Sequence, residues 1–495
     1  MLGKVLVANR GEIAVRVLRA CRELGLPTVA VYSTVDADAP HALLADEAVP
    51  LAGATARESY LDRDQLLDAA RRTGAAAIHP GYGFLSENAP FAAACRDAGL
   101  VFVGPPAEVI AALGDKAAAR ALAERAGVPV VPGGALVRGS TADAARSAQA
   151  IGYPLLLKAV AGGGGKGMRV VHRPEELEAA LGSVQHEAKA SFGDDGVLLE
   201  RFLVAPRHIE VQVLADAYGA AVHLGERECS LQRRHQKILE ESPSVAVSPE
   251  LRRALGEAAL KVVRAAGYVN AGTVEFLLDK DGSFYFLEVN TRLQVEHPVT
   301  ELVSGLDLVH EQLRIAAGEP LGLTQEAIGF RGHAIQCRIY AEDPERDFVP
   351  SPGVVLHLSE PSLVGLRIDS GIRAGQRIPV HYDPILAKLI VWAPDRARAI
   401  ARMRQALLGY VVLGPATNVS YLRAIIEHPA FAAGELSTEF LRQHLDGWRR
   451  HPPDAAIGAL AAALWARGER RSEGAETPES PRPDPWGRLE GFRMG

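Results

Sequence analysis

The stretch Thr273–Glu296 contains two apolar runs separated by Asp281-Gly282. An Asp-Gly pair between two strand-like runs predicts a β-hairpin with a two-residue turn. Counting outward from that turn places Glu275 directly opposite Glu288 on one face of the hairpin. Because like charges paired across a sheet are destabilising, this acid pair predicts either a bound cation or a raised pKa.

Further polar residues extend the same face. Asn290 lies two residues beyond Glu288, so its side chain points to the same side, and the alternation continues through Arg292, Gln294 and Glu296. Two carboxylates and an amide oxygen are ligands of the kind that hold magnesium. An edge hairpin with solvated charges is the alternative. Eight extended residues span roughly 27 Å, so Glu288 and Glu296 can serve one site only if the chain bends after Asn290.

Composition excludes several classes of protein. The chain has 495 residues, 48% of them hydrophobic, and a formal net charge of -6. This charge gives no excess of basic residues for binding nucleic acid. No apolar run reaches the roughly 20 residues that span a bilayer. Four cysteines are scattered without metal-ligand spacing, which predicts reduced thiols and no structural zinc. The first residues enter a strand without a signal or transit sequence, which predicts a cytoplasmic location.

The N-terminal part alternates short apolar runs with helix-like segments. The runs lie at residues 4–8, 28–33, 75–79 and 100–104. This alternation predicts a parallel sheet in a doubly wound domain. The loop at 79–88 follows one of these strands, at the end of the sheet where ligands usually bind. Within it, Ser86 is expected to cap a helix that begins near Glu87.

A run of four glycines at residues 162–165 lies between two strand-like segments. Without side chains, their backbone N–H groups can converge on an anion. The following Lys166 precedes Gly167 and a strand, not Ser or Thr and a helix, so this is not a Walker loop. A hairpin lid over nucleotide phosphates fits better, and a mobile glycine linker is the alternative. Lys158, within the preceding apolar strand, requires an anionic partner.

Two further segments carry polar groups suited to anionic ligands. Residues 208–214 alternate with period two and predict a half-buried strand with His208, Glu210 and Gln212 on one face. Residues 229–237 form a basic, amide-rich loop that suits an oxyanion such as bicarbonate or phosphate. Nucleic-acid binding is the competing interpretation, which the lack of interleaved aromatic residues disfavours.

Together these segments closely resemble biotin carboxylase, a family of the ATP-grasp superfamily. The resemblance rests on Gly162–Met168, the set Glu275, Glu288 and Asn290, Ser230–Lys237, and Asn290–Pro298. It implies an α/β chain with a doubly wound N-terminal domain at 1–114 and an ATP-grasp domain at 115–330 that includes a mobile lid at 131–203. A small, mostly β C-terminal domain would follow at 331–446, and a helix and flexible linker tail at 447–495.

The resemblance also implies a role for each matching position. ATP would be bound by Lys116, Lys158, Gly164, Gly165, Glu200, Arg201, Leu203, His208, Gln232, His235, Glu275 and Glu288. Magnesium or manganese would be held by Glu275, Glu288 and Asn290. Bicarbonate would be bound by Lys237, Arg292, Gln294 and Val295, and biotin by Arg338. Catalysis would involve Glu296, Arg292, Arg338 and Lys237.

The implied reaction is an ATP- and bicarbonate-dependent carboxylation of biotin. Glu296 would deprotonate bicarbonate for attack on the γ-phosphoryl group, and carboxyphosphate would break down to CO2 and phosphate. The phosphate would take the N1 proton of biotin while Arg338 stabilises the enolate oxygen. The implied partners are a biotin carboxyl carrier protein or domain, a carboxyltransferase subunit, and a second copy or a larger carboxylase complex, without nucleic acid or membrane.

Two departures bear on the type of carboxylase. Ala161 stands where bacterial acetyl-CoA carboxylase subunits usually have Gly, and Lys166 where they usually have Arg, a pattern closer to propionyl, methylcrotonyl and pyruvate carboxylases. Residues 484–493 resemble the segment ahead of the biotin carrier domain in acyl-CoA carboxylase α chains. No lysine follows Lys388, so we expect a separate carrier or a longer natural protein.

Two other functions compete with this interpretation. An ATP-grasp ligase that activates an organic carboxylate for attack by an amine would share the metal and glycine-loop residues, but has no use for Arg292, Glu296 and Arg338 together. A nucleotide-binding regulatory protein without turnover is disfavoured by the intact Glu288, Asn290 and Glu296.

Overall fold

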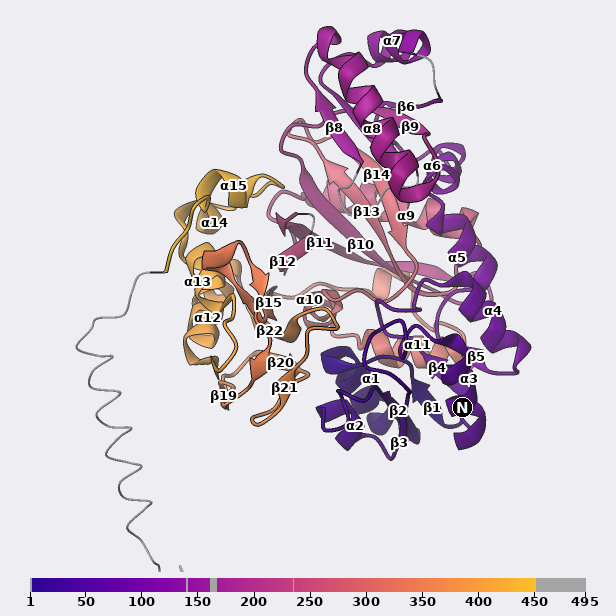
Figure 1. Ribbon diagram of the computed structural model, residues 1–495, viewed down its shortest axis with the longest axis vertical. Coiled ribbons are helices and arrows are strands. Elements are labelled where there is room, and N and C mark those ends of the chain that lie inside the picture. The colour runs from indigo at the N-terminus through magenta and orange to yellow at the C-terminus, as the bar shows by residue number, and fades with distance from the viewer. Residues whose placement is uncertain (1, 139–140, 161–166, 235, 451–495) are drawn as a thin grey trace, which may run out of the picture. The chain divides into compact units, whose positions relative to one another are not determined.

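A computed structural model describes residues 2–138, 141–160, 167–234 and 236–450 (Figure 1). The expected site residues Gly164, Gly165 and His235, and the tail from residue 451, lie outside the described residues. Those up to Trp448 pack as one unit. Within these ranges, no helix combines the length and the apolar character that crossing a membrane requires.

The N-terminal part contains a sheet of five parallel strands in the order β3-β2-β1-β4-β5. The strands are β1 (Val5–Val7), β2 (Thr28–Tyr32), β3 (Glu47–Pro50), β4 (Ala77–His79) and β5 (Val101–Phe102). The helices of this part are α1 (Gly11–Glu23), α2 (Pro40–Leu44), α3 (Arg63–Thr73), α4 (Ala89–Asp97) and α5 (Ala107–Gly114). The predicted doubly wound arrangement is confirmed.

The strand order reverses between β1 and β4, where a crevice for ligands opens in sheets of this kind. The loops that leave these two strands are joined by Asn9, whose Nδ2 donates to Pro80 O at 2.7 Å and Tyr82 O at 2.8 Å. The loop at 79–88 therefore lies where the sequence places it.

The predicted cap of the helix after this loop is wrong. Helix α4 is capped by Asn88, whose Oδ1 accepts the Phe91 N–H at 2.8 Å. Pro90 follows in the first turn, where its missing N–H costs nothing. Ser86 is buried instead, and Glu87 is left on the surface between them.

A second sheet has four antiparallel strands in the order β6-β9-β7-β8. They are β6 (Gly133–Val137), β7 (Leu155–Ala159), β8 (Met168–Val171) and β9 (Val197–Arg201). The helices of this region are α6 (Lys116–Arg125), α7 (Thr141–Ile151), η1 (Pro174–Glu176) and α8 (Leu177–Phe192). Since β7 and β8 pair with each other, the prediction of a strand on each side of the glycine run is confirmed.

The largest sheet has eight antiparallel strands in the order β14-β13-β10-β11-β12-β15-β22-β20. They are β10 (Arg207–Ala215), β11 (Ala221–Arg233), β12 (Gln236–Ser242), β13 (Asn270–Leu278), β14 (Phe284–Asn290), β15 (His333–Tyr340), β20 (Leu366–Ser370) and β22 (Ile385–Ala393). β10 is almost wholly buried, not half-buried. The basic segment 229–237 belongs mostly to β11 and β12, so the expected loop is the tip of a hairpin.

The sheet continues past residue 330, where β15, β22 and β20 extend it. The other elements from residue 249 onward are α9 (Pro249–Ala265), α10 (His297–Ser304), α11 (Leu308–Ala316), η2 (Gln325–Ala327), β16 (Glu342–Asp343), η3 (Pro344–Arg346), β17 (Val349–Pro350), β18 (Gly353–Val354), β19 (His357–Ser359), β21 (Arg377–Ile378), α12 (Arg396–Gly409), β23 (Val411–Leu413), α13 (Val419–Glu427), α14 (Pro429–Ala433) and α15 (Phe440–His444). An apolar core between α12 and the sheet contains Met403, Ala406 and Leu389.

The turn between β13 and β14 differs from the prediction by one residue. The Asp279 N–H donates to Ser283 O at 2.8 Å, which encloses the three residues 280–282. Gly282 takes the left-handed conformation, with φ of 86°, that such three-residue hairpin loops require. The predicted two-residue turn is therefore wrong.

The predicted pairing of the two acids is nevertheless present. Near the turn Phe276 pairs with Phe286, but farther out Glu275 pairs with Glu288. Leu287 is thus an extra residue on β14, a β-bulge that shifts the register by one. The bulge compensates for the longer turn and places Glu275 opposite Glu288.

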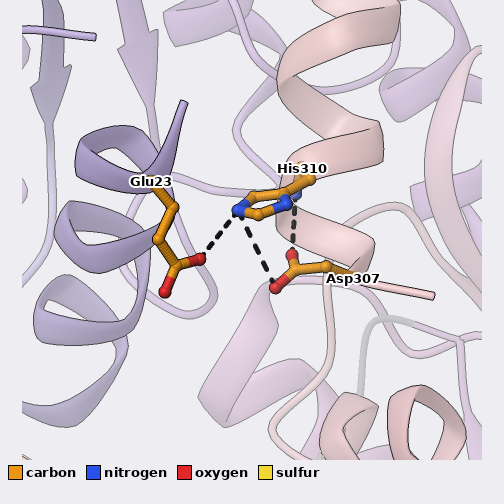
Figure 2. A group of neighbouring side chains, drawn as sticks. All are labelled: Glu23, Asp307 and His310. Carbon is orange, nitrogen blue, oxygen red and sulfur yellow. Dashed lines mark hydrogen bonds and ion pairs between the residues drawn. The ribbon is translucent and has the colours of Figure 1, made fainter. Parts of the chain in front are cut away.

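A network of ion pairs joins helices α1 and α11 (Figure 2). His310 Nε2 lies 2.9 Å from Glu23 Oε2, and Asp307 Oδ1 accepts the His310 N–H at 2.8 Å. The other oxygen of Asp307 accepts from Arg16 Nη2 at 2.6 Å. Because a guanidinium already neutralises Asp307, we interpret this group as a link between two helices and not as a metal site.

Candidate active site

The acid pair of the hairpin fits a divalent cation. Glu275 Oε1 accepts hydrogen bonds from Lys237 Nζ and Asn290 Nδ2, both at 2.9 Å. The side chain of Glu288 makes no hydrogen bond or close ion pair with another described residue, although the charges of Lys116, Lys237 and His208 act on it. Burial and the charge of Glu275 raise the pKa of Glu288. Two neighbouring carboxylates, one of them without a hydrogen-bond partner, are ligands of the kind that bind magnesium.

Lys237, on β12, is the centre of the site. Its Nζ donates to Glu210, and to Glu275 and Glu296 at 2.9 Å each. Burial alone lowers the pKa of a lysine, but the charges of Glu275 and Glu296 outweigh burial and raise the pKa of Lys237. Lys237 therefore stays positive and connects the hairpin of β13 and β14 to Glu296.

Glu296 is buried between two cations, with 2% of its surface exposed. Oε1 accepts from Lys237 Nζ and Oε2 from Arg338 Nη2, both at 2.9 Å. Burial favours the neutral acid, but Lys237 and Arg338 overcome that effect and hold the pKa of Glu296 well below its usual range. Glu296 is therefore ionised at neutral pH and can accept a proton.

The predicted bend after Asn290 is confirmed. β14 ends at Asn290 and α10 begins at His297, so the intervening segment turns back toward the sheet. Gln294 Nε2 donates to Glu275 Oε1 at 2.9 Å. Its Oε1 accepts from Arg227, a side chain with no exposed surface. The bend brings the residues on both sides of it into one hydrogen-bonded cluster.

Arg292 joins this cluster to the N-terminal sheet. Its Nε donates to Glu87 Oε2 and its Nη2 to Asn290 Oδ1, both at 2.8 Å. Glu87 belongs to the glycine-rich loop after β4, which explains how that loop contributes to the site. The neighbouring Val295 points its carbonyl oxygen away from these groups, toward Lys388 Nζ at 3.2 Å.

Two of the expected nucleotide residues form a separate pair on the four-stranded sheet. Lys158 Nζ donates to Glu200 Oε2, so the anionic partner that Lys158 requires is present. Glu200 Oε1 also accepts from Arg120 Nη1 at 3.1 Å. Leu203 is buried just beyond the end of β9, and Arg201 is exposed on that strand.

The other expected nucleotide residues lie nearer the hairpin. His208 Nε2 is 3.0 Å from Glu275 Oε2. Lys116 begins α6, and its charge acts on Glu288. Gln232, near the end of β11, donates from Nε2 to Cys229 O at 2.9 Å. These side chains and the Lys158–Glu200 pair thus belong to different sheets and helices.

Sequence reasoning did not assign roles to four residues that contact the site: Glu87, Glu210, Arg227 and Glu240. Glu240 Oε1 accepts from Arg338 Nε at 2.5 Å and thus orients the guanidinium that reaches Glu296. Period-two alternation had placed Glu210 on the same face as His208, which was the only signal for it. The other contacts join residues far apart in the chain.

Comparisons with known proteins agree with this architecture. Family models match the biotin carboxylase N-terminal domain at residues 1–110, the carbamoyl-phosphate synthase L chain ATP-binding domain at 115–324 and the biotin carboxylase C-terminal domain at 336–443. The mitochondrial methylcrotonoyl-CoA carboxylase subunit alpha of Dictyostelium discoideum is 48% identical over 495 residues, covering 99% of this chain and 70% of that protein. Biotin carboxylase of a Nostoc species is 51% identical over 440 residues, 89% of this chain and 98% of that protein.

A solved structure shares the fold. It is the biotin carboxylase domain dimer of Hydrogenobacter thermophilus 2-oxoglutarate carboxylase in complex with MgADP, ADP and bicarbonate. Its TM-score is 0.87 at 46% sequence identity, and the likeness covers 91% of this chain and 100% of that one.

The three sheets, the acid hairpin and the matched ATP-binding domain define an ATP-grasp ligase. Within that class, the relatives span almost the whole chain at about half identity. The chain belongs to the biotin carboxylase family and is an ATP-dependent biotin carboxylase.

Proposed function

We propose that this chain carboxylates carrier-bound biotin through carboxyphosphate, as the first half-reaction of an acyl-CoA carboxylase. The observation that supports this most directly is the position of Lys237. Its ammonium bonds Glu275, on the metal hairpin, and Glu296, on the segment after the bend. Arg338 bonds the other oxygen of Glu296. One cluster would therefore serve phosphoryl transfer and the activation of bicarbonate.

ATP and magnesium would bind on the hairpin side of this cluster. Glu275, Glu288 and Asn290 would hold magnesium, or manganese, which supplies positive charge against the phosphate oxygens. The free carboxylate of Glu288 supports this role. The remaining nucleotide contacts would come from Lys116, Lys158, Gly164, Gly165, Glu200, Arg201, Leu203, His208, Gln232 and His235.

Bicarbonate would bind beside Lys237, Arg292, Gln294 and Val295. Cations around its oxygens would lower its pKa, and Glu296, which is already ionised, would accept its proton. The freed oxygen would attack the γ-phosphorus of ATP, and ADP would leave. Removal of water from the closed site would protect the carboxyphosphate that forms.

Biotin would be carboxylated after carboxyphosphate breaks down to CO2 and phosphate. The phosphate would remove the N1 proton of biotin, and N1 would then form a bond with the carbon of CO2. Arg338 would stabilise the negative charge on the ureido oxygen. Glu240 holds Arg338 through Nε. The terminal nitrogens of the Arg338 guanidinium would then be shared between Glu296 and biotin.

ADP release by the purified chain tests this proposal. We expect ADP release to depend on bicarbonate and to rise when free biotin is added. A rate that bicarbonate and biotin leave unchanged would exclude the proposal. An amine-dependent rate with an organic carboxylate would instead support the rival ATP-grasp ligase, and bound ATP without turnover would support a regulatory protein.

The acceptor and the partners are also proposals. An acetyl-, propionyl- or methylcrotonyl-CoA type of carboxylase is supported by the name of the Dictyostelium relative, a methylcrotonoyl-CoA carboxylase subunit. We expect a biotin carboxyl carrier, a carboxyltransferase subunit and a homodimer or larger complex as partners. Native mass spectrometry of the complex tests these assignments.

Two predictions from the sequence stay predictions. The cytoplasmic location is one, since the Dictyostelium relative is named as mitochondrial. The division of the chain at residues 114, 330 and 446 is the other. Limited proteolysis would test these boundaries, and cell fractionation would test the location.

A further inference from the structure

Lys388 is a buried lysine that the proposed reaction does not use. It lies on β22 with no exposed surface. The register of the sheet places it directly opposite Arg338 on β15 and Asp369 on β20. Residues directly paired across a sheet point to the same face. Lys388 therefore shares a face with the arginine that binds Glu296.

The ammonium of Lys388 contacts residues from separate parts of the chain. Nζ donates to Val295 O at 3.2 Å and lies 3.0 Å from Glu12 Oε2. Asp369 Oδ2 is 3.6 Å away, and the centre of the Tyr82 ring is 5.8 Å away. Burying an ammonium costs several kcal/mol unless partners compensate for lost water. The side chain is therefore held in one place by contacts with α1, β20 and the segment after the bend.

Val295 is the part of the bicarbonate segment that Lys388 holds. The side chains of its neighbours Gln294 and Glu296 contact Glu275 and Lys237. The carbonyl of Val295 points back to the sheet, where Gln336 Nε2 also approaches it at 3.4 Å. Among the described donors near this carbonyl, only Lys388 carries a charge.

Glu12 fixes Lys388 from the N-terminal part of the chain. It lies in the first turn of α1 with 1% of its surface exposed. A Cβ on Gly371 would come within 2.4 Å of the Glu12 N, so the end of β20 packs directly against this turn. Apart from the Lys388 ammonium, the carboxylate oxygens of Glu12 have no hydrogen-bond or ion-pair partner among the described residues.

Burial raises the pKa of Glu12 to about 7, and the charge of Lys388 is the strongest effect that opposes this rise. The Glu12 carboxylate therefore depends on Lys388 for its charge. Among the described residues of the candidate site, this buried pair hydrogen-bonds the Val295 carbonyl.

We propose that Lys388 is a positioning residue for the bicarbonate step: its ammonium holds the Val295 carbonyl and thereby aims Gln294 and Glu296, and Glu12 anchors that ammonium. This proposal rests on the proposed role of residues 294–296 in binding and activating bicarbonate. Displacement of a reacting group by about 1 Å can cost 100-fold in rate, so a loosened segment would affect this step strongly.

Kinetics of Lys388→Met in the full chain test the proposal. Methionine keeps the length of the side chain and removes the donor. We expect the KM for bicarbonate to rise at least about tenfold, while the Kd for ADP, measured by equilibrium binding, changes less than about twofold. Lys388→Arg, which keeps a charged donor, should recover part of the bicarbonate affinity. If Lys388 were only structural, Lys388→Met would lower stability without raising the KM for bicarbonate more than the Kd for ADP.

Two further variants guard against misfolding. Because Lys388→Met leaves Glu12 without its cation, the double variant Glu12→Gln/Lys388→Met removes both charges and is expected to fold. Its KM for bicarbonate should stay raised, since the donor to Val295 is still absent. The matched control is Arg396→Met, which removes a partly buried cation, the partner of Glu241 at 2.7 Å, away from the bicarbonate segment. Arg396→Met should lower the melting temperature and leave the KM for bicarbonate and the Kd for ADP unchanged.

Hydrogen exchange separates this proposal from the proposed function. Backbone amides of the peptide 291–300 should exchange faster in Lys388→Met and in the double variant than in the wild type, whatever reaction the protein performs. If the wild type shows no bicarbonate-dependent turnover, the proposed function fails, and exchange alone decides whether Lys388 holds the segment. The positioning role is overturned if hydrogen exchange of this peptide is unchanged in the folded double variant. It is also overturned if the double variant is active and its KM for bicarbonate equals that of the wild type.

Discussion

Glu296→Gln is the substitution that tests the centre of the proposed mechanism. The glutamate is buried and accepts one hydrogen bond from Lys237 and one from Arg338, both at 2.9 Å. Glutamine has nearly the same shape, but it carries no charge, and its amide group can accept at only one of the two positions. The variant thus removes the proton acceptor and leaves the surrounding cations in place.

The expected losses can be worked from these contacts. A hydrogen bond to a charged group contributes about 1.5–3 kcal/mol to stability. Lys237 keeps Glu210 and Glu275 as partners, and Arg338 keeps Glu240. The free energy of unfolding should therefore fall by about 2–3 kcal/mol, not by the sum of two isolated bonds. A general base contributes roughly 10²–10⁴ in rate, so kcat should fall about 1,000-fold.

Bicarbonate- and biotin-dependent ADP release measures the catalytic loss, and equilibrium binding measures the affinity for ATP. We expect the Kd for ATP to change less than about twofold, because no described nucleotide residue except Glu275 shares a partner with Glu296. Glu241→Gln is the matched control: this buried glutamate binds His333 and Arg396, both at 2.7 Å. It should lose similar stability and keep its activity.

A large loss of ATP affinity in Glu296→Gln, with kcat nearly intact, would refute this reasoning. Such a result would assign Glu296 to the nucleotide site. Loss of activity in the Glu241→Gln control would show that general destabilisation, and not removal of the base, explains the effect.

Three other predictions follow from the same contacts. Glu288→Gln removes a carboxylate that only Glu275 repels, so stability without metal should not fall, whereas the magnesium concentration for half-maximal activity should rise about tenfold. Glu87→Gln weakens the ion pair that orients Arg292, so the KM for bicarbonate should rise about fivefold while the KM for ATP stays constant. Burial lowers the pKa of His79 to about 3 from 6.5. The unfolded chain therefore binds more protons between pH 3 and 6.5, stability rises with pH in this window, and His79→Gln should flatten the melting temperature between pH 4 and 6.5.

Local patterns in the sequence predict most elements of the fold. Strand-helix alternation predicts the parallel N-terminal sheet, and the segments flanking the glycine run are strands. The errors concern the cap of α4 and the turn between β13 and β14. At such element ends, small differences in free energy determine which residue takes a given position. Asn88 takes the cap position expected for Ser86 because the helix starts two residues later than predicted, with Pro90 in its first turn.

Contacts between distant segments cannot be read from local patterns. Arg292 and Glu87 are separated by 205 positions in the sequence. The place of the loop 79–88 predicts a nearby ligand, but no local pattern predicts that Glu87 binds Arg292. Arg227 lies within a strand whose sequence offers no sign that its guanidinium will bind Gln294. Family resemblance supplies the residues that match a motif. It does not supply the side chains that hold those residues in place.

The acid hairpin shows how a correct site can follow from an incorrect turn. The three-residue loop alone would place Glu275 opposite Leu287, and Glu288 would then point to the other face of the sheet. The bulge at Leu287 restores the pairing of Glu275 with Glu288. The turn and the bulge each shift the register by one residue in opposite directions, so together they pair the acids as a regular two-residue hairpin would. Deletion of Leu287 should therefore leave Glu275 opposite Glu288, because Glu288 would then directly follow Phe286, and magnesium-dependent activity should be kept. Loss of that activity in a folded variant would show that the bulge itself is required.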